Sequence, residues 1–149
     1  MPSASDVTHL LRRTEFVARP ERVAELAALP SIGAAVDNVL AVPSNPPGLA
    51  YSSPSHAVRI VEVTNSWLDR MAHDSPRPMQ EKMALFWHGH FVSDDAKAGN
   101  TATLAEQLDL YRRTGLGSLR QLAIAMATTV AMLRYLDNNQ NFSDAPNQN

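Results

Sequence analysis

The sequence contains no cysteine, and this absence removes several classes of chemistry. Disulfide bonds, thiolate metal ligands and thiol nucleophiles are all excluded. The absence of cysteine does not identify the cellular compartment, because exported proteins can also lack cysteine. No run of apolar residues approaches the roughly 18 that a membrane-spanning helix needs. The sequence therefore predicts a protein without a membrane span.

An excess of charge of one sign is also lacking, since 13 basic residues oppose 15 acidic residues. A nucleic-acid-binding surface needs clustered Lys and Arg to neutralise phosphates. We therefore expect no nucleic-acid partner. The sequence also has no glycine-rich phosphate loop and no serine in a nucleophile-elbow setting. The common nucleotide-binding and acyl-transfer chemistries thus have no support.

The 149 residues, of which 44% are hydrophobic, suit one globular domain spanning residues 1–149. Hydrophobic residues recur at helical spacing almost throughout, and no hairpin signal interrupts them. The expected fold is all-α, an irregular bundle of about six or seven helices. Prolines and serines concentrated in residues 41–55 predict one long loop. Residues 138–149 lose the periodicity and are expected to form a polar tail.

Capping residues and prolines predict where the helices begin and end. The residues expected to cap helices are Ser5, Ser31, Thr103 and Ser118. Pro20 is expected in the first turn of a further helix, and Gly115 just past the end of another. The last helix is expected to continue from Ser118 to Asp137, because its hydrophobic positions keep one face over that length.

The first candidate site lies in residues 81–97, which read EKMALFWHGHFVSDDAK. Residues two apart in an α-helix point about 200° apart. His88 and His90 can therefore share a metal ion only if the chain turns at Gly89, the kind of residue that favours a helix end. Asp94 and Asp95 follow within reach and would add oxygen ligands, giving a site suited to zinc or another divalent metal.

The alternative for the same histidines is structural. His90 falls on the hydrophobic stripe of the expected helix with Phe86 and Trp87, where a histidine is more often buried and bonded to a carbonyl group. His88 lies on another side, where solvent or a neighbouring helix would serve it. This alternative predicts a helix that ends at Gly89 and buries His90.

The second candidate site is a run rich in side-chain amides near the end of the chain. Its residues are Asp137, Asn138, Asn139, Asn141 and Asn147. The alternating carboxylates and the final glutamate of a calcium loop are absent. The run predicts a substrate-facing polar loop beside the histidines. The alternative is a helix end followed by turns, because Asp and Asn side chains bond local backbone in such places.

Three blocks of sequence carry a resemblance to a known family. They are HLLRRTEFVARPERVAEL, EKMALFWHGHF and LRYLDNNQNFSDAPNQN. In this order they resemble the N-terminal part of the bacterial family catalogued as domain of unknown function 1800, from about His9 to the final residue. The resemblance implies a larger helical fold without an established function. It also implies that this chain is a fragment, a truncated product or half of a split protein.

The resemblance sets further expectations. Family members often have Asp-Pro where this chain has Thr129-Val130, so the break they show in the last helix is expected to be absent here. Many relatives are exported, whereas this sequence shows no signal peptide, which predicts a cytoplasmic location. Catalytic residues remain unknown.

The predicted function is a helical module that depends on a protein partner or on a missing C-terminal segment. The alternative is a metal-dependent, hydrolase-like enzyme that uses His88 and His90 with a divalent metal ion.

Overall fold

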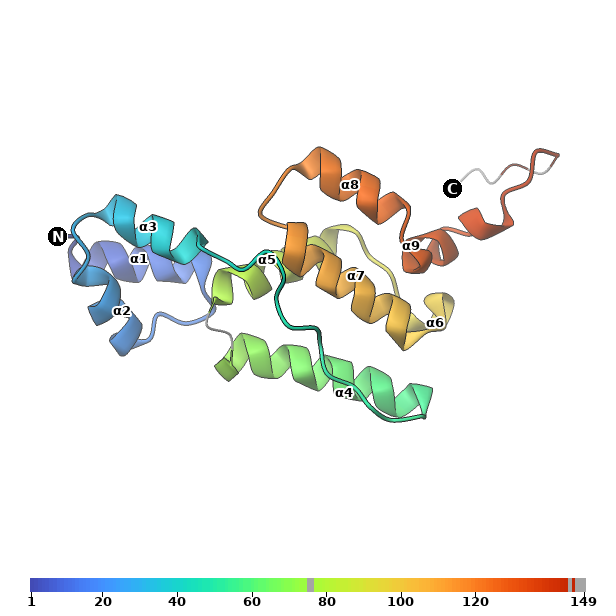
Figure 1. Ribbon diagram of the computed structural model, residues 1–149, viewed down its shortest axis with the longest axis horizontal. Helices are drawn as coiled ribbons and strands as arrows, with labels where there is room; N and C mark the ends of the chain where they lie inside the picture. Colours follow the sequence, from blue (N-terminus) through green and yellow to red (C-terminus); the bar gives the residue numbers. More distant parts are fainter. Residues whose placement is uncertain (75–76, 145, 147–149) are drawn as a thin grey trace.

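The computed structural model describes residues 1–74, 77–144 and 146, and within these ranges it contains no β-strand. The predicted all-α fold is confirmed. The α-helices are α1 (Ala4–Thr14), α2 (Pro20–Ala27), α3 (Ile32–Leu40), α4 (His56–Asp69), α5 (Pro78–His90), α6 (Asp95–Ala98), α7 (Thr101–Thr114), α8 (Leu119–Ala127) and α9 (Val130–Tyr135) (Figure 1). A π-helical turn, Arg70–Asp74, continues α4, and a 3-10 turn, Asn138–Gln140, follows α9. None of the helices in the described ranges is long and apolar enough to cross a membrane.

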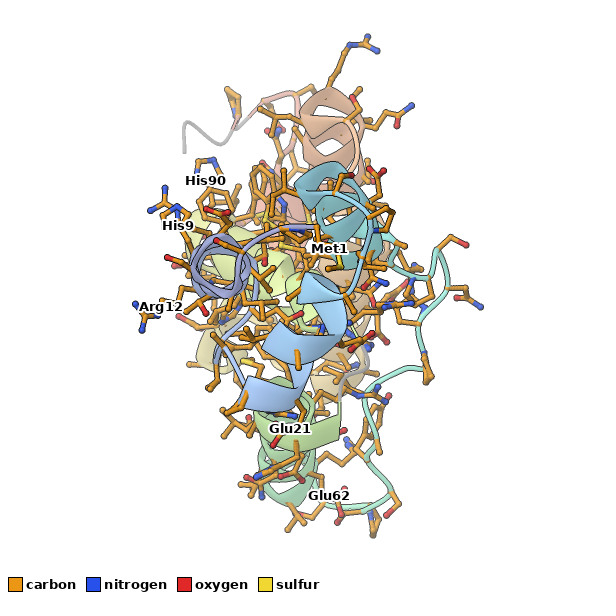
Figure 2. All side chains as sticks on the ribbon, turned by 90° about the vertical axis from the view of Figure 1, so that its left-hand side faces the viewer. Met1, His9, Arg12, Glu21, Glu62 and His90 are labelled. Carbon is orange, nitrogen blue, oxygen red and sulfur yellow. The ribbon has the colours of Figure 1, made fainter. Side chains whose placement is uncertain are left out.

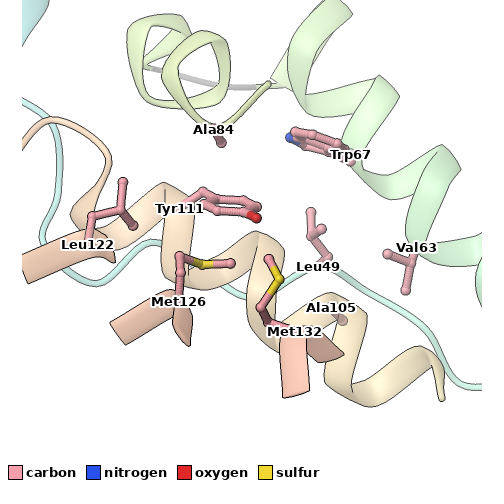
Figure 3. Close-up of a cluster of buried hydrophobic side chains, with 9 residues drawn as sticks. All are labelled: Leu49, Val63, Trp67, Ala84, Ala105, Tyr111, Leu122, Met126 and Met132. Atoms are coloured by element: carbon pink, nitrogen blue, oxygen red, sulfur yellow. The ribbon is translucent and has the colours of Figure 1, made fainter. Parts of the chain in front are cut away.

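Two hydrophobic clusters organise these helices. Helices α1, α2 and α3 lie together at one end of the molecule and enclose the smaller cluster (Figure 1). Its buried members are Val7, Leu11, Leu26, Ala35 and Val39. The larger cluster lies between α4, α5, α7, α8 and α9, with α4 and α8 on opposite sides of α7. Its buried members are Leu49, Val63, Trp67, Ala84, Ala105, Tyr111, Leu122, Met126 and Met132 (Figure 3).

Helix α5 connects the two clusters. Ala84 is fully buried in the larger cluster, while Met79, one turn earlier, packs against the smaller one. Between them, Lys82 Nζ donates to the carbonyl oxygens of Arg12 (3.2 Å) and Glu15 (2.8 Å) at the end of α1. A cation stabilises a helix C-terminus, where carbonyl groups lack partners within the helix. Lys82 therefore fixes the end of α1 against α5.

Several predicted helix ends are confirmed. Ser31 caps α3 and Ser118 caps α8, each through its side-chain oxygen. Pro20 is the first residue of α2, and Gly115 directly follows α7. Residues 41–55 contain no helix, so the predicted long loop is present between α3 and α4.

Two predicted caps are wrong, because better-placed polar residues begin the helices earlier. Ser3, not Ser5, caps α1, and its Oγ accepts a hydrogen bond from the backbone N–H of Asp6 at 3.1 Å. Asn100, not Thr103, caps α7 through a 2.9 Å bond from the N–H of Ala102. Both are strong capping residue types in the extended conformation that a cap requires.

The expected continuous last helix is also wrong, because it is broken into α8 and α9. Thr128 ends α8, and Thr129 adopts an extended conformation and caps α9. The hydroxyl of Thr129 accepts a hydrogen bond from the N–H of Met132 at 3.3 Å. A threonine cap thus produces the break without a proline at the next position, which is Val130.

The buried face of α5 differs from the predicted one. Phe86 and His90 of the predicted stripe are exposed, with Phe86 58% accessible, whereas Trp87 is half-buried against the larger cluster. The buried residues of α5 are Gln80, Glu81 and Ala84. Two polar side chains occupy the interior because each has hydrogen-bond partners there. Hydrophobic periodicity cannot identify such a face, since it treats polar residues as solvent-exposed.

A buried ion pair joins α5 to α7. The Nε and Nη2 atoms of Arg112 donate to the carboxylate of Glu81 at 3.0–3.1 Å, and both side chains are 1% exposed. Arg112 Nη1 also donates to Asp109 Oδ1 and to the carbonyl oxygen of Pro47, both at 2.7 Å. Trp67 Nε1, from α4, donates to Glu81 Oε2 at 3.1 Å. Burial of charged side chains is costly unless they are paired and their remaining hydrogen bonds are satisfied, and the Glu81–Arg112 pair meets both conditions.

The same network holds the long loop in place. Gln80 Nε2 donates to the carbonyl oxygens of Pro43 and Arg112, both at 2.8 Å. Together with the contact from Arg112 to Pro47, this gives the loop two anchors on buried side chains. The loop carries several prolines and cannot form a regular backbone ladder, so side-chain donors satisfy its carbonyl groups.

The ion pair is expected to contribute strongly to stability, because removing one partner leaves the other charge buried without compensation. Arg112→Met is expected to lower the free energy of unfolding by about 3–5 kcal/mol, measured by urea denaturation. The matched control is Arg113→Met at the neighbouring exposed position, which should change it by about 0.5 kcal/mol or less. Similar losses in the two variants would contradict a special role for the pair.

Candidate functional site

A cleft of about 250 Å³ lies between α4, α5, α6 and α7, and we call it the α4–α7 cleft. Its apolar walls come from α4 and α7, which contribute Ile60, Val63, Leu104 and Leu108. Trp67 of α4 closes the wall beside α5. Five polar side chains also line it, Thr64, His88, Ser93, Asp95 and Gln107. Apolar walls with a few convergent polar groups are typical of small-molecule sites.

His88 lies in the last turn of α5 and is half-buried in the cleft. Its ring meets the Trp67 ring edge-on, with centroids 5.6 Å apart and an interplanar angle of 84°. Burial lowers the pKa of His88 below its ordinary value of 6.5, because the charged imidazolium loses hydration there. At neutral pH the ring is therefore uncharged, with one nitrogen to donate and one to accept.

Ser93 and Gln107 are the two buried polar residues of the cleft lining. Both side chains are buried, and Gln107 Nε2 donates to Ser93 Oγ at 3.1 Å. The serine hydroxyl acts as acceptor in this bond, which leaves its proton available for a further acceptor. Ser93 lies in the short connection between α5 and α6, and Gln107 on the inner face of α7.

Asp95 begins α6 and faces a histidine from the start of α4. His56 Nε2 lies 3.0 Å from Asp95 Oδ2 and 2.9 Å from Oδ1, and only the Oδ2 contact has hydrogen-bond geometry. On the other side of the ring, Thr101 Oγ1 lies 3.0 Å from His56 Nδ1. Asp95 Oδ1 is buried and accepts no hydrogen bond from the described residues. Such an oxygen is costly unless another donor reaches it.

The structure does not bring the predicted metal ligands together. Helix α5 continues through His90, so the predicted end at Gly89 is wrong and the two histidines point to different sides. His90 is exposed, contrary to its predicted burial, and its ring contacts Phe86, Trp87 and Phe91.

The two aspartates of the predicted metal set have other roles. Asp94 caps α6 by accepting from the N–H of Lys97 at 2.9 Å, and Asp95 contacts His56. Over residues 1–74, 77–144 and 146, no group of three or more His, Asp or Glu side chains is placed to hold a metal ion.

The amide-rich run is placed in part. Asp137 has a left-handed backbone (φ 56°), and its Oδ2 accepts from Lys97 Nζ at 2.6 Å. Asn138 begins the 3-10 turn and Asn141 follows it. Asn147 lies outside the described residues. The run thus begins beside α6, next to an open hollow of about 430 Å³ lined by Lys97, Arg134 and Asp137 among others.

Sequence reasoning missed four residues at or beside the cleft. They are His56, Ser93, Thr101 and Gln107. His56 and Asp95 are 39 residues apart, and no local motif links them. The only available signal was weak, namely a histidine at the start of a helix and an aspartate pair before another.

Comparison with known proteins places the chain in a family but assigns it no activity. A family model described as "Protein of unknown function (DUF1800)" matches residues 9–149. No curated protein and no solved structure matches the chain. The chemistry of the α4–α7 cleft therefore has to be judged from its own residues.

The lowered pKa of His88 predicts a pH dependence of stability. As the pH falls below 6.5, the unfolded chain binds a proton at this residue before the folded chain does. The stabilisation is thus complete above pH 6.5 and is lost as the pH falls toward the lowered pKa. His88→Gln is expected to reduce the difference in free energy of unfolding between about pH 7.5 and pH 5, measured by urea denaturation.

The control for this experiment is His90→Gln, at an exposed position on the same helix. An equal reduction in both variants would show that the buried environment of His88 is not the cause.

Proposed function

Because this chain belongs to the DUF1800 family of proteins of unknown function, we propose a function from its site: a helical domain that binds a small ligand in the α4–α7 cleft. One observation carries the proposal. The cleft joins an apolar wall to a neutral imidazole, a serine–glutamine pair and a carboxylate. Convergent polar groups above apolar walls fix the orientation of a ligand and supply its specificity.

The size of the cleft limits the ligand. Its volume of about 250 Å³ is below the range of about 300–1,000 Å³ that is usual for drug-sized molecules. It corresponds to about eight water molecules. A compact molecule with a single ring or a short branched chain matches this space. The walls belong to packed helices, so the ligand meets a largely preformed surface.

Binding agrees with the geometry better than catalysis does. The hydroxyl of Thr101 contacts His56, but Thr101 is fully buried and a substrate cannot reach it. Ser93 has a glutamine rather than a base as its hydrogen-bond partner. The alternative of a hydrolase using His88 and His90 gains no support, since the two rings diverge along α5.

Blocking the cleft is expected to weaken binding. The test uses benzyl alcohol and benzylamine as probes, with amide chemical shifts of His88 and Gln107 as the readout; affinities of about 1 mM are expected for ligands of this size. Thr64→Trp, at the exposed rim of the cleft, is expected to weaken binding at least about tenfold.

The matched control is Asn65→Trp, at the next and equally exposed position of α4, which does not line the cleft. The proposal fails if neither probe shifts the cleft residues. It also fails if both tryptophan variants reduce binding to the same extent.

A second candidate function is a module that docks on a second polypeptide, supported by an exposed aromatic cluster on α5. Phe86 is 58% exposed and meets the Trp87 ring edge-on at 4.9 Å, and His90 stacks on Phe86 at 6.4 Å. Figure 2 shows His90 on the same side of the molecule as His9 and Arg12 of α1. Aromatic side chains are enriched where proteins meet, and such a patch can pack on its own copy.

Phe86→Ser tests this second function. The variant is expected to lower the free energy of unfolding by less than about 1.5 kcal/mol, the value of one aromatic pair. It is expected to reduce self-association of the chain, measured by sedimentation velocity over a range of concentrations. Val17→Ser, at a residue 61% exposed on the α1–α2 connection, is the control. A parent chain that stays monomeric at every concentration would rule out docking on a second copy.

A further inference from the structure

We infer that the ligand of the α4–α7 cleft is a small organic cation, a protonated amine on a compact apolar body, with its ammonium group on Asp95. This inference rests on the proposed binding function and adds the chemical class of the ligand. It is carried by three features: a carboxylate in a lining whose described residues include no Lys or Arg, neighbouring cations that are already engaged, and apolar walls.

The carboxylate of Asp95 contacts the imidazole of His56. His56 Nε2 lies 3.0 Å from Asp95 Oδ2, and Thr101 Oγ1 lies 3.0 Å from His56 Nδ1. A single ring proton, on Nε2, is enough for both contacts, because Nδ1 then accepts from the Thr101 hydroxyl. Oδ1 is buried and accepts no hydrogen bond from the described residues, but the Asp95 side chain as a whole is 38% exposed, so an ammonium group that enters the cleft pairs with the carboxylate from its exposed side.

Three cations on or beside α6 and near the start of α4 are engaged elsewhere. Lys97, two residues after Asp95, pairs with Asp137 at 2.6 Å. Arg134 Nη1 donates to the carbonyl oxygen of Ala98 at 3.0 Å, and Arg59 Nη1 to that of Pro54 at 3.2 Å. None of these three side chains lines the cleft. None of these three cations therefore competes with a ligand for the carboxylate of Asp95.

The remaining lining fits the rest of such a molecule. Ile60, Val63, Leu104 and Leu108 provide a surface for hydrocarbon, and burial of that hydrocarbon supplies most of the binding free energy. Burial keeps His88 neutral at neutral pH by lowering its pKa, so it adds no positive charge that would repel an amine. An anionic ligand would instead meet the carboxylate of Asp95.

The test compares three probes that share a benzyl or phenyl skeleton and differ in charge: benzylamine, benzyl alcohol and benzoate. Dissociation constants are measured from amide chemical shifts at neutral pH and low salt. Benzylamine is expected to bind about tenfold more tightly than benzyl alcohol, a modest factor because the Asp95 side chain is 38% exposed and partly screened. Benzoate is expected to bind more weakly than the alcohol.

Asp95→Asn is expected to remove the preference for the amine, so that benzylamine and benzyl alcohol bind with similar dissociation constants. Retained chemical-shift changes of His88 and Gln107 on addition of benzyl alcohol report that the cleft remains folded in the variant. The control is Asp94→Asn, which removes the same charge one residue earlier, and asparagine preserves the cap of α6. This control should keep the preference of the parent chain.

The outcomes separate the two proposals. If the alcohol binds as tightly as the amine, or if Asp94→Asn and Asp95→Asn reduce the preference equally, the cation inference is overturned while the cleft remains a binding site. If none of the three probes binds, the proposed function itself fails. A preference that disappears only in Asp95→Asn confirms the inference.

Discussion

The buried ion pair between Glu81 and Arg112 is the constraint on which the arrangement of the larger cluster depends. It lies where α4, α5, α7 and the long loop meet, and each of these segments bonds to it directly. A buried charge pair stabilises a fold only when its further hydrogen bonds are satisfied. Here Trp67, Asp109 and Pro47 satisfy them, so a displacement of any one segment would leave a buried charged group without one of its hydrogen-bond partners.

The same constraint shapes the α4–α7 cleft. The indole of Trp67 is fixed at its nitrogen by Glu81, while its ring forms a wall of the cleft and contacts His88. A rigid aromatic wall holds the imidazole at the depth where burial lowers its pKa. The electrostatic character of the cleft is therefore linked to an ion pair that does not itself line it. Sites supported in this way keep their geometry without help from a ligand.

The sequence predicts the helices better than it predicts their partners. Proline and capping residues placed the starts of α2, α3 and α8 correctly, because these signals act within one turn of helix. The pairing of Arg112 with Glu81 was not predicted, and the predicted buried face of α5 was wrong at Phe86 and His90. Both errors have the same cause. Burial of Glu81 depends on an arginine 31 residues away, and local periodicity carries no information on such a pairing.

The residues of the candidate site also come together through contacts that local sequence patterns do not reveal. Their arrangement explains the conspicuous His-Gly-His segment. An α-helix that continues through Gly89 sends neighbouring histidines to different surfaces, so the two rings face different chemistry. His88 enters the cleft beside Trp67, and His90 joins the exposed aromatic cluster beside Phe86. One turn of α5 thus serves both candidate functions. A single metal site could not account for this segment, whereas a helix with two different faces can.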